Sequence, residues 1–486
     1  MVTNSSALTR NIIALFLGAT GITLLLISLL VFKLTAGVAL IAFVLGVGYI
    51  GLISLHQRFG YYFFLILCMA YPSIQLYFGV GQFGVILDSI LLITVLTFLY
   101  AHYSTSNSEL DFYRYKSFWI WVVWILLSLT IQALNWENVN WLSFTYGIRR
   151  QHLNPLGLIL LNILFIKTKR DFKLALLSHL SGAVFLALIS ERQFLFGFNS
   201  FEFSLLQTPF GRTHLLPGIT RYWGGFTDAA SSGIGLSLMI LAAIPFVINK
   251  SQLRGRTWIY LMIALFVHAG LLSGTRSAYA SFAAGTLIIT LMYVRPKIQW
   301  TIIGISSIVF GVLRFTSLGS SYTVIRRLRS VFDRQDASLL VRISNRLKLD
   351  DWLQSHPLGG GIGAASFDKR FAVDSFLSTF PPDGLFVLIK AELGFLGIAF
   401  FYIICALIIV YMFVAILKTP NYTDAKLWMS TCLALFIAAR VSDYAQMISF
   451  QFPLVNLLFL SIVAFEKFQY WPQKVVFFQK REAPLR

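Results

Sequence analysis

Four short clusters of arginine, glycine, aspartate and histidine interrupt an otherwise apolar chain of 486 residues. Each cluster borders an apolar run or lies in a polar segment between two runs. Because their residue types can bind anions or transfer protons, these clusters are the first candidates for a functional site. They are 221–228 (RYWGGFTD), 273–277 (SGTRS), 356–363 (HPLGGGIG) and 381–397, which begins PPDG and contains Glu392-Leu393-Gly394 followed by Gly397.

Arg221 and Arg276 are the residues best suited to hold a phosphate or a diphosphate. Arg276 occupies a short turn between two apolar runs, beside the N-terminus of the helix predicted next. A guanidinium group together with helix N-terminal amides forms a site for such an anion. The alternatives are that Arg221 is an interfacial arginine reaching lipid headgroups and that Arg276 belongs to an ordinary tight turn.

Asp383 and His356 are candidates for proton transfer and substrate contact. A carboxylate at the edge of a low-dielectric site can act as a base, although Asp383 could instead cap the helix predicted after it. His356 either contacts a ligand or only hydrogen-bonds within its loop. The four glycines that follow it either let the backbone approach a bulky polar ligand or form a flexible loop. These are Gly359, Gly360, Gly361 and Gly363.

The apolar runs that must position these residues are typical of membrane-spanning helices. Hydrophobic residues make up 57% of the chain and charged residues 12%, with a mean hydropathy of +0.75, so water is not its main solvent. We therefore predict an all-α polytopic membrane protein with about 12–14 transmembrane helices, each crossing a ~30 Å hydrocarbon core. The predicted spans are 11–32, 35–55, 60–79, 83–101, 117–133, 153–167, 172–191, 229–248, 257–273, 276–294, 299–314, 384–416, 427–442 and 447–466.

Five regions follow from these spans. The run at 384–416 is long enough to begin with a bent or re-entrant segment, and the connection at 135–152 is expected to be a loop. The three cysteines lie far apart inside apolar runs, so their spacing indicates neither a disulfide framework nor a metal site. The regions are 1–200 (N-terminal transmembrane helices), 201–314 (transmembrane helices with the arginine clusters), 315–383 (a large loop), 384–466 (C-terminal transmembrane helices) and 467–486 (a basic tail).

Lysine and arginine in the short connections predict that both termini are cytoplasmic and that 315–383 is external. The basic residues of this loop run against the positive-inside bias, so Arg342 and Arg346 are further candidates for substrate contact. Ser338–Trp352 has helical periodicity and is predicted to lie on the membrane face as an amphipathic helix. Lysine and arginine in the connections predicted to be cytoplasmic account for most of the net charge of +19. We therefore expect no nucleic-acid partner.

In this order the clusters resemble motifs of the O-antigen ligase and polymerase superfamily of bacterial envelope glycan assembly. Arg221 with Gly224-Gly225-Phe226 is similar to the family's Arg followed by Gly and Phe, and 273–277 is similar to its small-residue turn ending in Arg. The stretch 356–363, followed by Glu392 and its glycines, is similar to its loop glycines and Glu-x-Gly-x-x-Gly motif. The resemblance covers roughly 221–397 and implies a GT-C-like membrane fold.

The resemblance implies glycosyl transfer from a polyprenyl-diphosphate-linked oligosaccharide at the outer face of the bacterial inner membrane, without a cofactor. Arg221 and Arg276 would then hold the diphosphate, and Asp383 would act as the base. Ligases of the family carry His followed by Asn, Ser or Gln where this chain has Asp383 followed by Gly384. This departure favours a polymerase that joins repeat units of an O-antigen or exopolysaccharide.

Two other functions stay open. One is a ligase of the same superfamily, which transfers the glycan to a lipid A core or another acceptor. The other is a flippase or transporter of lipid-linked oligosaccharide, which would concentrate polar residues at mid-membrane. The expected partners are the lipid-linked oligosaccharide, membrane lipids, a chain-length regulator and a flippase. Aspartates are available at 333, 336, 350 and 351, but no spacing favours a metal, so we expect none.

Overall fold

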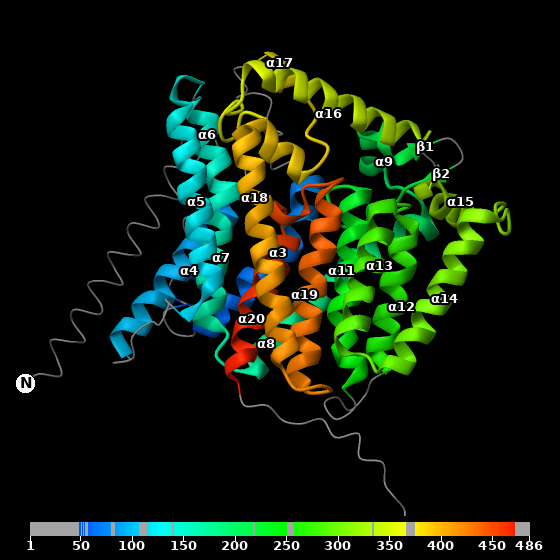
Figure 1. Cartoon of the computed structure of the whole chain (residues 1–486), viewed down its shortest axis with the longest axis horizontal. Helices are drawn as coiled ribbons and strands as arrows, with labels where there is room; N and C mark the ends of the chain where they lie inside the picture. Colours follow the sequence, from blue (N-terminus) through cyan, green and yellow to red (C-terminus); the bar gives the residue numbers. More distant parts are fainter. Residues whose placement is uncertain are drawn as a thin grey trace, which may run out of the picture.

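The protein is a bundle of long helices (Figure 1). The computed structural model describes residues 48, 49, 51, 53, 57–78, 83–105, 114–138, 140–216, 219–249, 257–332, 335–365 and 375–471. Strands within these residues are limited to β1 (Leu215–Leu216) and β2 (Ile219–Thr220), which pair antiparallel. The predicted all-α, polytopic class is therefore confirmed.

A helix occupies each predicted span from 60–79 onward. In the described part of the chain, seven helices are long and apolar enough to cross a membrane, namely α3, α5, α8, α11, α14, α18 and α19. The predicted spans 11–32 and 35–55 lie almost entirely outside the described residues, so the total number of spans stays a prediction. The helices are α3 (Gln57–Phe78), α4 (Phe83–Thr105), α5 (Lys116–Leu134), α7 (Asn154–Phe165), α8 (Lys169–Phe196), α11 (Ala229–Ile248), α12 (Thr257–Leu272), α13 (Arg276–Tyr293), α14 (Pro296–Phe315), α18 (Leu385–Lys418), α19 (Asp424–Asp443) and α20 (Leu454–Tyr470).

Helices α11 and α19 are the most buried of these spans. Both are rich in small and apolar residues on all sides, the pattern of helices surrounded by other helices. Gly285 lets α13 approach α11 closely, because a Cβ at this position would lie 2.3 Å from Leu241 Cδ1. The hydroxyls of Ser281 and Ser442, 2.5 Å apart, join α13 to α19. Helix α13, whose first residue is Arg276, is thus fixed to the core of the bundle.

Helix α18 bends near its start. Gly394 has non-helical dihedral angles (φ 63°, ψ −159°), which separate a short segment, 385–393, from the rest of the helix. A positive φ of this kind favours glycine. The bent start that the length of this apolar run predicted is confirmed.

The connection predicted as a loop at 135–152 is instead helical from Trp141. Helix α6 (Trp141–Ile148) continues through a π-helical turn, η3 (Arg149–Leu153), into α7. The polar η3 is tolerated inside the protein because its charges are paired: Arg149 Nη1 lies 2.7 Å from Asp88 Oδ2. This tertiary pairing was not visible in the hydropathy of the segment.

The region 315–383 is largely helical where the structure describes it. It contains α15 (Thr323–Arg329), η4 (Ser330–Phe332), α16 (Ala337–Ser355) and α17 (Ser375–Thr379). The helix predicted over Ser338–Trp352 is confirmed as α16, which lies across one end of the bundle (Figure 1). We call this the α16 end. The N-termini of α11, α13 and α18 also lie there (Figure 1).

Candidate functional site: an arginine cluster at the α16 end

Four arginines from four separate elements lie close enough at the α16 end to influence one another electrostatically. Burial, followed by the charges of neighbouring arginines, lowers the pKa of Arg221 to about 10. Burial and the charge of Arg276 also lower the pKa values of Arg327 and Arg342. Like charges held together in this way favour a bound anion. We call Arg221, Arg276, Arg327 and Arg342 the arginine cluster.

Arg221, which follows β2, braces the turn between α12 and α13. Its Nε donates to the Ser273 carbonyl (3.0 Å) and its Nη2 to Thr275 Oγ1 (3.0 Å). A third bond runs from Nη1 to the Thr213 carbonyl (2.9 Å). These bonds use three of the five guanidinium N–H groups. Arg221 therefore positions the turn that carries Arg276 and keeps donors for an anion.

Arg276 connects the start of α13 to the start of α16. Its Nη1 lies 2.7 Å from Asp336 Oδ2, and its Nη2 donates to Asp336 Oδ1 at 2.8 Å. Asp336 also caps α16 by accepting from Leu339 N (3.1 Å). The bidentate pair lowers the pKa of Asp336 against the opposing effect of burial. Arg276 thus has a structural role in addition to the anion-binding role predicted for it.

Arg327 and Tyr279 are members of the site that the sequence reasoning missed. Arg327 Nε and the Tyr279 hydroxyl are buried and have no hydrogen-bond partner within the described part of the chain. The charges of Arg327 and Arg221 act on Tyr279, which places the three groups near one another. Buried donors without an acceptor are costly, and phosphate oxygens would satisfy them. The sequence signal for Tyr279 was its position one helical turn after Arg276.

Asp383 lies beside the arginine cluster. Its Oδ2 accepts a hydrogen bond from Nδ2 of Asn345 on α16 (2.9 Å). Its charge also acts on Arg342, which lies one helical turn before Asn345. The residue that caps α18 is Gly384. The alternative that Asp383 is this cap is therefore wrong, and its carboxylate is half-buried next to a cation.

Arg346, the other α16 arginine predicted to contact substrate, points to the helix ends beneath α16. Its guanidinium carbon lies 3.9 Å from the centre of the Tyr444 ring, and its Nη2 donates to the Tyr444 carbonyl at 3.1 Å. Lys390 forms an ion pair with Asp350 farther along α16. These contacts hold α16 onto α18 and α19.

His356 lies away from the arginine cluster. It ends α16 and stacks on Trp352, with ring centroids 4.2 Å apart. Its Nδ1 lies 2.9 Å from Ser355 Oγ. Fourteen residues of helix separate it from Arg342, a distance of about 21 Å along the axis. His356 stays with the glycines that follow it, since its carbonyl accepts from Gly359 N at 2.8 Å, and the structure does not bring it to the arginine cluster.

The glycines at 359, 360, 361 and 363 contact backbone. Gly360 N and Gly361 N donate to the carbonyls of Ala391 and Glu392, each at 2.9 Å, at the bend of α18. Gly359, Gly361 and Gly363 have positive φ values of 78°, 92° and 86°. A Cβ at Gly359 would lie 2.6 Å from the Glu392 carbonyl. Gly359, Gly360 and Gly361 thus let the loop pack against α18, and Gly363 lets it pack against Ser143 of α6.

One comparison identifies the segment that carries most of this site. Residues 259–402 match a protein-family model described as O-Antigen ligase. We call this matched segment the O-antigen ligase domain. It begins in α12 and ends in α18, and it includes every member of the arginine cluster except Arg221. A comparison with the curated proteins found no match.

The match over residues 259–402 supports a relationship to the O-antigen ligase and polymerase superfamily, whose members are in general glycosyl-transfer enzymes. The domain supports a ligase-type or polymerase-type function and does not distinguish the two. It and the apolar helices agree with a membrane location. Within the described residues, no group of three or more His, Cys, Asp and Glu side chains could hold a metal ion.

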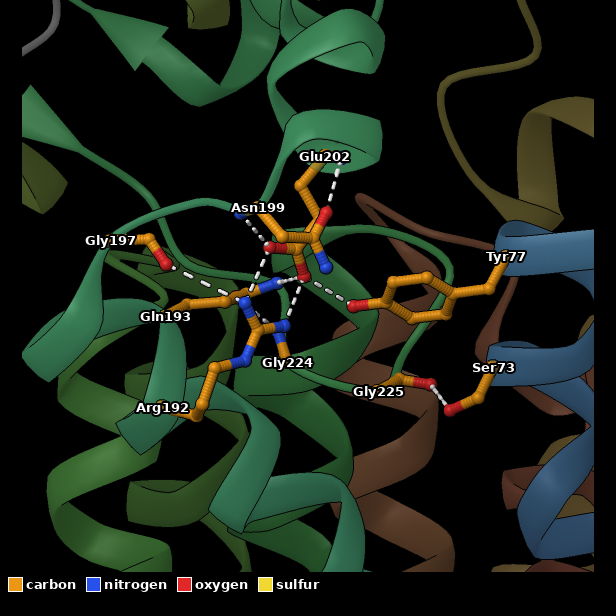
Figure 2. A network of polar contacts seen from close by, with 9 residues as sticks. All are labelled: Ser73, Tyr77, Arg192, Gln193, Gly197, Asn199, Glu202, Gly224 and Gly225. Atoms are coloured by element: carbon orange, nitrogen blue, oxygen red, sulfur yellow. Dashed lines mark hydrogen bonds and ion pairs between the residues drawn. The ribbon is translucent and has the colours of Figure 1, made fainter.

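Arg221, outside the O-antigen ligase domain, is followed by a segment anchored on a buried carboxylate (Figure 2). Glu202, in the short helix α9 (Ser200–Leu206), accepts from Arg192 Nη1 (2.7 Å) and from the Tyr77 hydroxyl (2.5 Å). Burial would raise the pKa of Glu202, but these bonds and others lower it to about 2. Beside them, Gln193 accepts from Gly224 N at 2.9 Å. The network ties the segment after Arg221 to α3 and α8.

Proposed function

We propose that the protein polymerises polyprenyl-diphosphate-linked oligosaccharide repeat units into a surface polysaccharide, at the non-cytoplasmic face of the bacterial inner membrane. The observation that carries this proposal is the arginine cluster and the neighbouring Tyr279, because buried donors on Arg327 and Tyr279 have no hydrogen-bond partner among the residues that the structure describes. It lies at one end of a membrane bundle, where the headgroup of a lipid-linked substrate would be found. The O-antigen ligase domain makes glycosyl transfer the chemistry to expect.

In the proposed reaction, the arginine cluster binds the diphosphate of the donor. An acceptor hydroxyl oxygen attacks the anomeric carbon, and the bond between this carbon and the diphosphate oxygen breaks. The electron pair stays on the diphosphate, where the guanidinium groups stabilise the new charge. Each hydrogen-bond donor placed where negative charge develops in the transition state typically raises the reaction rate by a factor of about 10²–10³. Polyprenyl diphosphate leaves, and the acceptor chain grows.

Asp383 is the proposed base that accepts the proton of the attacking hydroxyl. It is partly exposed, and its Oδ2 accepts from Asn345 Nδ2 at 2.9 Å, which leaves Oδ1 for the acceptor as far as the described residues show. The charge of Asp383 acts on Arg342, a member of the arginine cluster, so the carboxylate lies next to the proposed diphosphate site. This position beside the arginine cluster supports Asp383 as the base for an acceptor held next to the donor.

The identity of the residue at position 383 favours polymerisation over ligation. The resemblance implies a His at this position in ligases, and this chain has Asp. A transporter is less compatible, because the arginine cluster, Asp336 and Asp383 lie together at the α16 end instead of mid-membrane.

The test is deletion of the gene followed by gel analysis of the surface glycan. Loss of the ladder of chain lengths with single repeats retained supports a polymerase. Complete polymer that stays lipid-linked and unattached indicates a ligase, and lipid-linked repeats trapped inside the cell indicate a flippase. Restoring the ladder with wild-type protein, but not with Arg327→Gln at equal membrane levels, assigns the effect to the arginine cluster.

A further inference from the structure

We infer that the hydrocarbon chain of the polyprenyl diphosphate lies along an exposed apolar face of α13 that starts at Arg276. This inference rests on the proposed function and adds the location of the lipid part of the donor. It comes from the exposure pattern of α13, the lack of packing along α14 and the position of both helices below the arginine cluster.

The exposed residues of α13 form one continuous face. Ala280, Ala283, Leu287 and Leu291 are exposed, and their spacing of three or four residues puts them on one side of the helix. Arg276 precedes Ala280 by four residues and continues the same line. The opposite side, with Ser281 and Gly285, is buried against α19 and α11. From Arg276 to Leu291 this face is about 22 Å long.

The shape of the face suits a flexible chain. Alanine occupies its two positions nearest Arg276, and leucine occupies the two farther away. Small side chains next to the guanidinium leave room for the first isoprene units, which must lie directly beside the diphosphate. The two leucines then supply apolar contact deeper in the membrane. The charge of the headgroup and the apolar chain of one molecule thus match the two ends of this face.

Helix α14 leaves space beside α13. None of its residues is buried, and a Cβ built on Gly304 or Gly311 would meet nothing within 4 Å. Figure 1 shows α14 inclined away from its neighbours toward α15. Its first turn is nevertheless tied to α13, because Gln299 Nε2 donates to the carbonyls of Thr290 (3.0 Å) and Val294 (2.7 Å).

The other end of α14 is tied as well. It leads into α15, and the Ser330 carbonyl that follows accepts from Arg276 Nη1 at 3.2 Å. Helix α14 is therefore joined to α13 directly at its first turn and, beyond its other end, through α15 and η4, while none of its own residues is buried. Lipid can reach the α13 face from the bilayer, and a chain anchored at Arg276 would lie between the two connections.

Site-directed photocrosslinking tests this location in the full chain reconstituted in nanodiscs. Photoreactive benzoylphenylalanine is introduced at Ala283 or Leu287, and at Val410 as a control, which is 58% exposed on α18. The probe is a radiolabelled long-chain polyprenyl diphosphate. We expect saturable labelling at 283 and 287, several-fold above that at 410, which unlabelled polyprenyl diphosphate displaces and phosphatidylglycerol does not.

Three results would overturn the inference while leaving the proposed function intact: saturable binding with equal labelling at 410, displacement of the label by phosphatidylglycerol, or a crosslink to a second copy of the chain. Absence of any saturable binding to the wild type would instead contradict the proposed function itself. A second readout is Ala283→Trp, with Val410→Trp as its matched control. Ala283→Trp should raise KM for long-chain donors and leave KM for short-chain donors unchanged.

Discussion

The Arg276–Asp336 pair separates the structural role of Arg276 from its proposed role with the diphosphate. Both side chains are mostly buried, with exposed fractions of 19% and 17%. Removing either partner leaves the other unsatisfied, which costs about 1–3 kcal/mol of folding stability. Arg276→Ala and Asp336→Ala should therefore lower the melting temperature by similar amounts, because each breaks the same connection to α16.

The two variants should differ strongly in activity. Arg276→Ala removes a donor to the leaving group and should lower the transfer rate by about 10²–10³, equal to about 2.7–4 kcal/mol. Asp336→Ala keeps the guanidinium group and should lower the rate by less than about tenfold. The assay is chain extension by purified protein in nanodiscs, normalised to folded protein. Equal rate losses in both variants would refute the diphosphate role of Arg276.

Three further predictions address Asp383, the packing of Gly359 and the orientation of the chain. If Asp383 is the base, Asp383→Asn should abolish chain extension with little change in melting temperature. Retention of most activity would exclude this role. Asn345→Ala, which removes the hydrogen bond to Asp383, is the matched control. Gly359→Ala should destabilise the protein, since a Cβ there would meet the Glu392 carbonyl at 2.6 Å, whereas Gly304→Ala on the open α14 should be neutral by thermal melting. A reporter fused near Ala365 should be external, and a cytoplasmic signal would contradict the proposed orientation.

Glu202 supplies a prediction about acid stability. Its pKa is lowered to about 2 from a usual value of 4.5, so it favours the folded state above that usual value. This contribution, about 3 kcal/mol, is lost as the pH falls from about 4.5 toward 2. The melting temperature of the wild type should thus fall as the pH is lowered through this range. The melting temperature of Glu202→Gln should be lower than that of the wild type above pH 4.5 and should change less with pH. Identical pH profiles would show that the network does not stabilise the fold.

Much of the fold was predictable because bilayer thickness forces long apolar helices. Hydropathy therefore located the helices from 60–79 onward, and the length of the run at 384–416 indicated its bend. Hydropathy did not predict the helical segment at 141–153, since Arg149 marks the end of an apolar run unless its partner Asp88 is known. A pairing between residues 61 positions apart is a property of the tertiary structure.

The site was predictable in part. Helix ends at one side of a membrane must lie near one another, so Arg221 and Arg276 could be grouped from topology. The ion pair to Asp336 could not be predicted, because 60 residues separate the partners. The close packing of Gly359 on the Glu392 carbonyl could not be predicted either, since a glycine needed for backbone packing and one needed for a ligand look the same in a sequence. Tyr279 was missed because a tyrosine in an apolar helix is usually a packing residue.

The measurement that tests the central claim most directly is reconstitution of the purified protein with isolated lipid-linked repeat units. The products are separated by length, and the released lipid is analysed. We predict glycans of two, three and more repeats still attached to lipid, with one polyprenyl diphosphate released for each bond formed. Unchanged single repeats, or transfer only to an added lipid A core, would contradict the proposed polymerase.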